Sequence, residues 1–345
     1  MTRSIPLPAP APGTRGPPRG WHWQRVRRVL LAGFALLVLG LLVSGARDMD
    51  WAGAWRALRG YDIETLLLAG GLAALSHALY GSFDLLGRGY TGHRLSTARV
   101  WATAFVSYAF NLNLGSLVGG FGLRLRLYSR AGLRAGVIGR IIGISLVTNW
   151  LGHAAAGGVV LALGAIALPP SWPLHGIDLR LCGIAVLLAV AGYLAACVAW
   201  PRRRWSLRGH RIELPDARLA FTQLLLSTAN WSLMGGVIFV LLGARVAYPT
   251  VLGVLLLAGV AGVITHIPAG LGVLEAVFLA FLGAQLPQAT LLGAMLAYRA
   301  LYYLLPLAAA IAVYFMLEGT AGRAALPDEA TDRPQFPAPP EPRMP

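Results

Sequence analysis

Two ionisable residues, Glu275 and Arg299, lie inside long apolar stretches of this 345-residue sequence. Glu275 comes 11 residues before Leu286, and Arg299 comes 10 residues after Ala289. If the two stretches form an antiparallel helical hairpin, the helical rise puts both side chains about 15 Å from its turn. That depth is close to the middle of a bilayer, where a lone charge costs at least about 2.5–3.5 kcal/mol. We therefore expect Glu275 to pair with Arg299.

The sequence predicts a break in the backbone directly before this acid. The stretch THIPAGLGVLEAVFLAFLGA (residues 265–284) carries Pro268, Gly270 and Gly272 ahead of Glu275. A helix that starts after such a break has backbone N–H groups without helical partners, and these groups can bind an anion. Two interpretations stay open. The ion pair either fixes helix packing only, or it lines a polar path for a charged lipid headgroup.

A second group of basic residues follows a glycine-rich break in GGFGLRLRLYSRAGL (residues 119–133). We expect Arg124 and Arg126 at the cytoplasmic membrane surface, where arginine side chains can bind phosphate oxygens through paired N–H donors. The alternative is that they supply only the positive charge that cytoplasmic loops carry. Arg140 lies slightly deeper, and its side chain is expected to extend toward the interface.

The other polar residues within apolar segments form weaker patterns. Asn149 and His153 are four residues apart on one helix face, and His77 and Asp84 are seven apart. Each pair is a candidate metal or proton site, but hydrogen bonding between helices is the favoured interpretation. Since no nucleotide-binding loop, zinc-ligand cluster or nucleophile elbow occurs, we predict no cofactor, no metal and no catalytic residue. The candidate polar network consists of Asn149, His153, Arg140 and His266.

Composition places these residues in a membrane. The chain is 57% hydrophobic and only 12% charged, whereas about a quarter of the residues in a soluble domain are charged. Several apolar stretches reach about 20 residues, the length that crosses a bilayer as a helix. The net charge of +15 comes from arginines that lie mostly in short loops beside apolar spans. This pattern is typical of membrane topology and of contact with anionic lipids, and it argues against nucleic-acid binding.

The predicted fold is all-α: an integral membrane bundle of about 7–9 segments, some of them re-entrant or broken. Residues 1–24 are expected to be a disordered cytoplasmic N-terminus, and residues 320–345 a disordered cytoplasmic tail. The transmembrane domain takes up residues 25–319. Its first apolar run, Val29 to Gly45, is a retained helix or, alternatively, a signal peptide. The further apolar segments are approximately 63–86, 100–121, 137–168, 179–200, 219–242, 248–266, 271–286 and 289–317.

The distribution of arginine predicts which segments cross the membrane. If 100–121 crosses fully, the arginine-rich loops at 124–134 and 201–211 both lie outside, against the positive-inside rule. If 100–121 enters and leaves on one side, both loops and both termini are cytoplasmic. The asparagines and glycines of this segment favour the re-entrant hairpin over an ordinary span. Segments 248–266 and 271–286 are two spans or a second re-entrant pair from the other side. Broken elements that enter the two halves from opposite faces are typical of an inverted-repeat transporter, although the sequence shows no residue-level repeat.

The motifs GGFGLRLRLYSRAGL, SLVTNWLGH, HIPAGLGVLE and AYRALYYLLP occur here in order. Over roughly residues 25–320 the chain resembles the lysylphosphatidylglycerol synthase transmembrane family, which includes YbhN-like inner-membrane proteins and the flippase part of MprF proteins. The resemblance implies movement of a lipid or lipid-linked substrate across the cytoplasmic membrane. By motif match, it assigns site roles to Arg124, Arg126, Tyr128, Pro268, Gly270, Gly272, Glu275 and Arg299.

The chain departs from the family pattern in two ways. MprF proteins append a soluble aminoacyl-transferase domain and this chain has none, so we do not expect an enzyme, although lipid transferase activity stays open. Many members also place an acid beside the arginine of the helix that matches 137–160. Here the stretch reads VIGRIIG, and that part of a charge network lacks its acid.

We predict a multi-pass protein of the bacterial cytoplasmic (inner) membrane that flips an anionic phospholipid or a lipid-linked intermediate. Its expected partners are membrane lipids with anionic headgroups, further copies of the chain, and envelope-synthesis enzymes. The alternatives are a non-transporting scaffold or accessory subunit in cell-envelope lipid metabolism, and an integral-membrane lipid transferase.

Overall fold

The computed structural model describes residues 51–166, 176–200, 204–207, 210–265, 267 and 270–324. All of them belong to the compact unit that begins at Asp50. Several predictions lie outside the described residues: those for residues 1–24, for the run Val29 to Gly45, for His266 and Pro268, and for the tail after Ala324.

The described part of the chain is a bundle of helices, which confirms the predicted all-α membrane fold. Six helical stretches in it are long and apolar enough to cross a membrane. The only strands in this part are β1 (Arg204–Leu207) and β2 (His210–Glu213), which pair in an antiparallel hairpin. The helices are α2 (Trp51–Arg59), α3 (Ile63–Gly81), α4 (Phe83–Thr91), α5 (Thr97–Leu114), η1 (Ser116–Leu123), α6 (Arg124–Arg130), α7 (Ala135–Ala162), α8 (Gly176–Ala199), α9 (Ala217–Leu241), α10 (Tyr248–Thr265), α11 (Val273–Leu282), α12 (Gln288–Tyr298), η3 (Arg299–Leu304) and α13 (Leu305–Ala324).

Local sequence sets where several of these helices begin. Asp62 and Asp216 precede α3 and α9, and their carboxylates accept the backbone N–H groups of Thr65 and Leu219 at 2.7 and 2.8 Å. Such N-caps satisfy donors that have no partner inside the helix. The helices α3 and α4 meet at Ser82 and together form one span of 29 residues. Likewise α12, η3 and α13 follow one another without a break, and their span has 32 residues.

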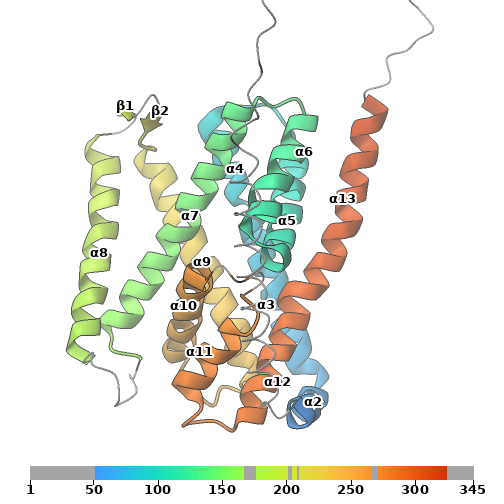
Figure 1. The fold of residues 1–345 in the computed structure, drawn as a ribbon. Helices are drawn as coiled ribbons and strands as arrows, with labels where there is room; N and C mark the ends of the chain where they lie inside the picture. The colour runs from blue at the N-terminus through green and yellow to red at the C-terminus, as the bar shows by residue number, and fades with distance from the viewer. Residues whose placement is uncertain are drawn as a thin grey trace, which may run out of the picture. The chain divides into compact units, whose positions relative to one another are not determined.

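The first hairpin consists of α5, η1 and α6, which enter and leave at the same end of the bundle (Figure 1). Gly115 turns the chain after α5 with a φ of 86°, a conformation that favours glycine. Gly119 then packs directly on α5, because a Cβ here would lie 2.0 Å from the backbone N of Asn111. The chain therefore turns back on itself between α5 and α6, as the re-entrant prediction for 100–121 requires.

The second hairpin consists of α10 and α11, which begin and end at the opposite end of the bundle (Figure 1). Gly270 and Gly272, with φ values of 55° and 76°, lie in the turn before α11. The 10 residues of α11 extend only about 15 Å, half of the hydrocarbon core. The short α11 matches the re-entrant alternative, whereas α10, with 18 residues, is itself long and apolar enough to cross a membrane.

The two halves of the bundle repeat one pattern in opposite directions. In each half a span precedes the hairpin and another follows it: α3–α4 and α7 in the first half, α9 and α12–η3–α13 in the second. The hairpins enter from opposite ends (Figure 1), and the leading spans α3 and α9 pack along each other. This is the expected inverted repeat, an arrangement that builds a site at mid-depth.

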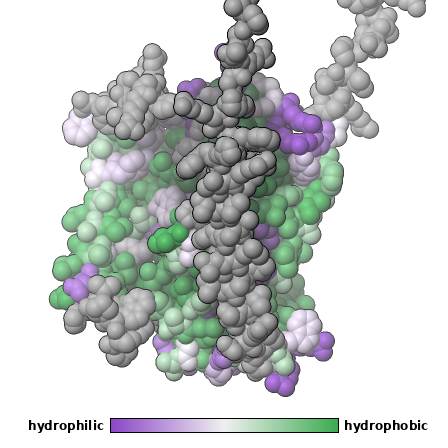
Figure 2. Space-filling view, viewed as in Figure 1, coloured by the Kyte–Doolittle hydropathy of each residue, from purple (hydrophilic) through white to green (hydrophobic). Residues whose placement is uncertain are grey.

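The helix α6, the β1–β2 hairpin and the last turn of α13 lie at one end of the bundle, which we call the arginine-rich end (Figure 1). Between the two ends the surface is largely apolar, and hydrophilic side chains gather toward the ends (Figure 2). Leu67, Leu188 and Phe315 are each at least two-thirds exposed on this surface, as lipid contact requires. The helix α13 runs to Ala324, so the boundary predicted at residue 320 falls inside a helix.

Candidate functional site

The first buried ion pair joins the second hairpin to the span that follows it. Arg299 Nε donates to Glu275 Oε1 at 2.5 Å. Its Nη2 donates to Glu275 Oε2 and to the Gly270 carbonyl, both at 3.0 Å. The two side chains are only 12% and 13% exposed. The expected pairing is therefore present, and the same guanidinium also holds the turn of the hairpin.

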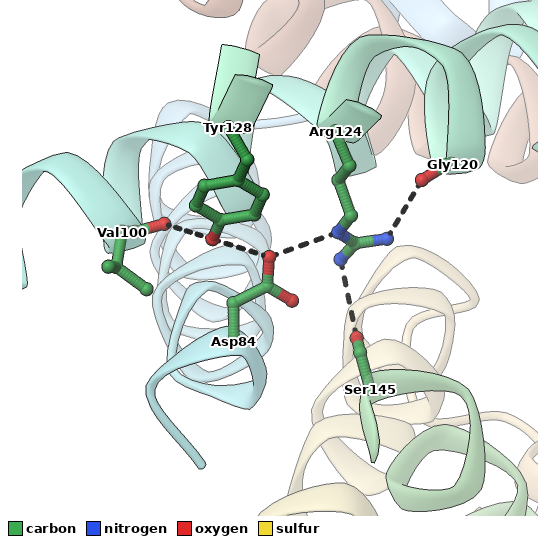
Figure 3. A network of polar contacts seen from close by, with 6 residues as sticks. All are labelled: Asp84, Val100, Gly120, Arg124, Tyr128 and Ser145. Atoms are coloured by element: carbon green, nitrogen blue, oxygen red, sulfur yellow. Dashed lines mark hydrogen bonds and ion pairs between the residues drawn. The ribbon is translucent and has the colours of Figure 1, made fainter. Parts of the chain in front are cut away.

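The second ion pair joins the first hairpin to α4 (Figure 3). Arg124 Nε donates to Asp84 Oδ2 at 3.0 Å, and the Tyr128 hydroxyl donates to the same oxygen at 2.9 Å. Arg124 also donates to the Gly120 carbonyl and to Ser145 Oγ of α7, both at 3.3 Å. The Asp84 side chain is 0% exposed and that of Arg124 is 5% exposed. This pair is therefore buried more deeply than the first.

The structure separates Arg124 from Arg126, which the sequence placed together at the membrane surface. Arg126 is 52% exposed, and its Nε donates to Glu318 Oε1 of α13 at 3.0 Å. Arg130 pairs with the same carboxylate. Residues two apart on a helix do not share a face, so α6 directs Arg124 into the bundle and Arg126 to its surface. The surface placement of Arg124 is therefore wrong.

Tyrosine side chains extend inward from the second ion pair. The Arg124 guanidinium lies 5.8 Å from the centre of the Tyr80 ring, which stacks on Tyr108 with ring centroids 3.5 Å apart. The Tyr108 hydroxyl lies 3.1 Å from that of Tyr302, and the Tyr302 hydroxyl lies 2.7 Å from Ser76 Oγ. These contacts connect the first hairpin, α3 and the π-helical stretch η3.

A cavity of about 560 Å³ lies between the tips of the two hairpins. Gly115 and Ser116 of the first hairpin line it, as do Gly262 and Gly270 of the second. Tyr303 also lines the cavity, and the Arg299 guanidinium lies 5.4 Å from its ring centre. The wall further includes Tyr80, Tyr108, Asn111, Asn149, Trp231 and Met234. Both ion pairs therefore lie next to tyrosine rings that form part of the wall.

Comparison with known proteins assigns the family. Residues 29–310 match the family model described as "Lysylphosphatidylglycerol synthase TM region". The chain belongs to this family. It is 43% identical over 310 residues to the inner membrane protein YbhN of Escherichia coli strain K12, with 90% of this chain and 98% of that protein covered. It is 29% identical over 295 residues to an uncharacterized protein of Synechocystis, with 84% of this chain and 91% of that protein covered. The motif resemblance is confirmed.

In this lysylphosphatidylglycerol synthase TM region, the helix that contains VIGRIIG contributes a hydroxyl to the charge network. Ser145 of α7 contacts Arg124, whereas Arg140 is exposed. The carboxylate comes from Asp84 of α4. Sequence reasoning noted Asp84 only in a weak pattern with His77. The stronger signal was the position of Asp84 inside an apolar run, where a carboxylate needs a partner.

In the described part of the chain, Arg140 lies apart from the other members of the predicted polar network. Arg140 and Asn149 are nine residues apart on α7, which separates them by about 14 Å. His153 packs edge-on against the Trp231 ring, with centroids 4.7 Å apart. Asn149 contributes its backbone carbonyl, which accepts from Ser227 Oγ and Trp231 Nε1 at 3.1 Å. No group of three metal-ligating side chains occurs among the described residues.

Proposed function

We propose that the protein moves an anionic phospholipid or a lipid-linked intermediate between the two leaflets, and that the chain itself catalyses no covalent step. The observation that carries the proposal is the cavity between the hairpin tips. A lipid that changes leaflets must take its headgroup through about 30 Å of hydrocarbon. A cavity with polar lining near mid-depth lowers this barrier for the headgroup while the acyl chains remain in lipid.

The two broken helices support binding of a headgroup phosphate. The helix η1 begins at Ser116 and α11 begins at Val273, and both of these residues line the cavity. Helix starts carry a partial positive charge and N–H groups without helical partners. In inverted-repeat transporters, half-helices of this kind point at anionic groups of the substrate. The two ion pairs keep the hairpins that carry these helix starts in place.

The positive-inside rule orients the protein. The arginine-rich end carries Arg126 and Arg130 and the last turn of α13, so we assign this end and the C-terminal side of α13 to the cytoplasm. The first hairpin then enters from the cytoplasm and the second from the opposite side. In this orientation a headgroup from either leaflet meets one hairpin tip at the cavity.

Lipid translocation in proteoliposomes tests the proposal. The vesicles carry phosphatidylglycerol with a fluorescent acyl chain, and dithionite quenches the label that reaches the outer leaflet. Gly262→Leu is the informative variant, because Gly262 lines the cavity and a Cβ there meets nothing within 4 Å. Gly192→Leu is the matched control on the exposed surface of α8, where a Cβ also meets nothing within 4 Å.

We expect rapid protein-dependent translocation for the wild type and for Gly192→Leu. Gly262→Leu should be slower by about tenfold or more, which corresponds to about 1.4 kcal/mol in the barrier. Equal rates for the two variants would locate the path elsewhere. No protein-dependent translocation would favour the scaffold alternative, and a new lipid product would indicate a transferase.

A further inference from the structure

The cavity wall has no charged side chain among the described residues that line it. The two nearby arginines are engaged with their own carboxylates, Arg124 with Asp84 and Arg299 with Glu275. A headgroup inside the cavity therefore meets tyrosine rings, a tryptophan ring, amide and hydroxyl groups and apolar side chains, rather than an array of cations.

Besides the tyrosines, the side-chain amide and serine hydroxyl groups of the wall come from three elements. Asn111 of α5, Ser116 of η1 and Asn149 of α7 all line the cavity. The Oδ1 atom of Asn111 is buried, has no hydrogen-bond partner in the described part of the chain and lies close to Gly120 of η1. Asn149 lines the cavity beside Trp231, and its backbone carbonyl accepts from Ser227 Oγ and Trp231 Nε1.

Amide and hydroxyl groups both donate and accept hydrogen bonds. The best match for such a set is a ligand that also does both. A phosphate oxygen only accepts and an ammonium group only donates, whereas each hydroxyl of a polyol or a sugar donates one bond and accepts others. The hydrogen-bonding pattern of Asn111, Ser116 and Asn149 therefore fits hydroxyl groups.

The aromatic part of the wall argues against a cationic headgroup. Aromatic cages bind cations over the faces of their rings. Here Tyr80 stacks on Tyr108 at 3.5 Å and also has the Arg124 guanidinium 5.8 Å from its ring centre. The Tyr303 ring has the Arg299 guanidinium 5.4 Å from its centre. Two of the tyrosines in the wall are thus already paired with cations of the protein.

We propose that the cavity selects a lipid headgroup that carries hydroxyl groups, as glycerol or a sugar does. It would disfavour headgroups of equal charge that lack hydroxyls, and also cationic, aminoacylated headgroups. This inference rests on the proposed function. The helix starts at Ser116 and Val273 take the phosphate where one is present, and Asn111, Ser116 and Asn149 take the hydroxyls.

The test compares fluorescent lipids that differ only in their headgroup, in the same proteoliposome assay. Phosphatidylglycerol and phosphatidylpropanol have the same charge and nearly the same size, but only the first has free hydroxyls. Glucosyl diacylglycerol and lysylphosphatidylglycerol complete the set.

Because each hydroxyl contributes a hydrogen bond, phosphatidylglycerol should move at least about tenfold faster than phosphatidylpropanol. Lysylphosphatidylglycerol should be slower than phosphatidylglycerol. If glucosyl diacylglycerol is the faster of the two hydroxyl lipids, the occupant is a sugar; if it is the slower, the occupant is a glycerol headgroup.

A variant ties the selectivity to the wall. Asn149→Leu combined with Ser116→Ala keeps the Asn149 backbone carbonyl, and with it the contacts to Ser227 and Trp231. The ratio between phosphatidylglycerol and phosphatidylpropanol should fall toward one in this variant. The ratio is measured within one preparation, so a partial loss of folded protein lowers both rates and leaves it unchanged.

Equal protein-dependent rates for phosphatidylglycerol and phosphatidylpropanol would overturn this inference and leave the proposed function standing. Faster movement of lysylphosphatidylglycerol than of phosphatidylglycerol would also overturn it. A double variant that keeps the wild-type ratio would overturn the assignment of the two side chains. If no lipid moved in a protein-dependent way, the proposed function itself would fail.

Discussion

Glu275→Gln removes the charge that faces Arg299 while keeping the size of the side chain. Arg299 then keeps the Gly270 carbonyl and meets one amide oxygen in place of a carboxylate that it contacts at both oxygens. Removing one partner of a buried ion pair costs about 3–5 kcal/mol. Since the two side chains are 12% and 13% exposed, water screens part of the remaining charge. We expect a loss of about 3 kcal/mol, at the lower end of that range.

The stability loss expected for Glu275→Gln can be compared with the losses expected at two other ion pairs of the same chain. The Asp84 and Arg124 side chains are 0% and 5% exposed, so Asp84→Asn should cost about 5 kcal/mol, at the upper end of the range. Arg126 is 52% exposed, and exposed pairs contribute only about 0–1 kcal/mol. The expected order of stability loss is therefore Asp84→Asn, then Glu275→Gln, then Arg126→Gln.

Thermal unfolding in detergent, followed by tryptophan fluorescence, measures this series. For Glu275 and Arg299, the two single variants, the double variant and the exchange (Glu275→Arg with Arg299→Glu) form a thermodynamic cycle. The exchange should restore part of the lost stability, because an ion pair persists. Strictly additive effects would refute the claim that these two side chains stabilise each other. Wild-type lipid translocation by a stable Glu275→Gln protein would show that the carboxylate has a structural role only.

Three further predictions concern topology, packing and pH. Reporters fused after Arg130 and after Arg204 should both read cytoplasmic, and a signal from the other side at either position would contradict the assigned orientation. Gly119→Ala should destabilise the first hairpin, because its Cβ would lie 2.0 Å from the α5 backbone, whereas Gly143→Ala, with nothing within 4 Å, should not lower the melting temperature. Similar losses for both alanines would show that the hairpin is not packed as described. Burial raises the pKa of Tyr61 from 10.0 to about 12. The stability that the neutral phenol contributes is therefore complete below pH 10 and is lost as the pH rises toward 12. Tyr61→Phe should weaken the decline of thermal stability over that interval, and an unchanged decline would contradict the assignment.

The sequence by itself determined the features that depend on short connections and on simple rules. Glu275 and Arg299 are 24 residues apart across one tight turn, so the helical rise alone sets them at equal depth. The cost of an unpaired charge in lipid then predicts the pairing. The first hairpin was predictable because the positive-inside rule leaves 100–121 no full crossing, and its glycines permit the turn. The apolar composition determined the all-α membrane class, because every backbone polar group in lipid must be satisfied within helices.

Only the tertiary structure decided which faces of the helices meet. Asp84 and Arg124 are 40 residues apart, and their contact depends on how α6 is rotated against α4 and α7. Arg124 and Arg126 look equivalent in the sequence, yet one is buried and the other is exposed. That none of the described residues lining the cavity is charged is a further consequence of packing. Each guanidinium at that depth is stable only beside its own carboxylate, and only the folded chain brings the two together.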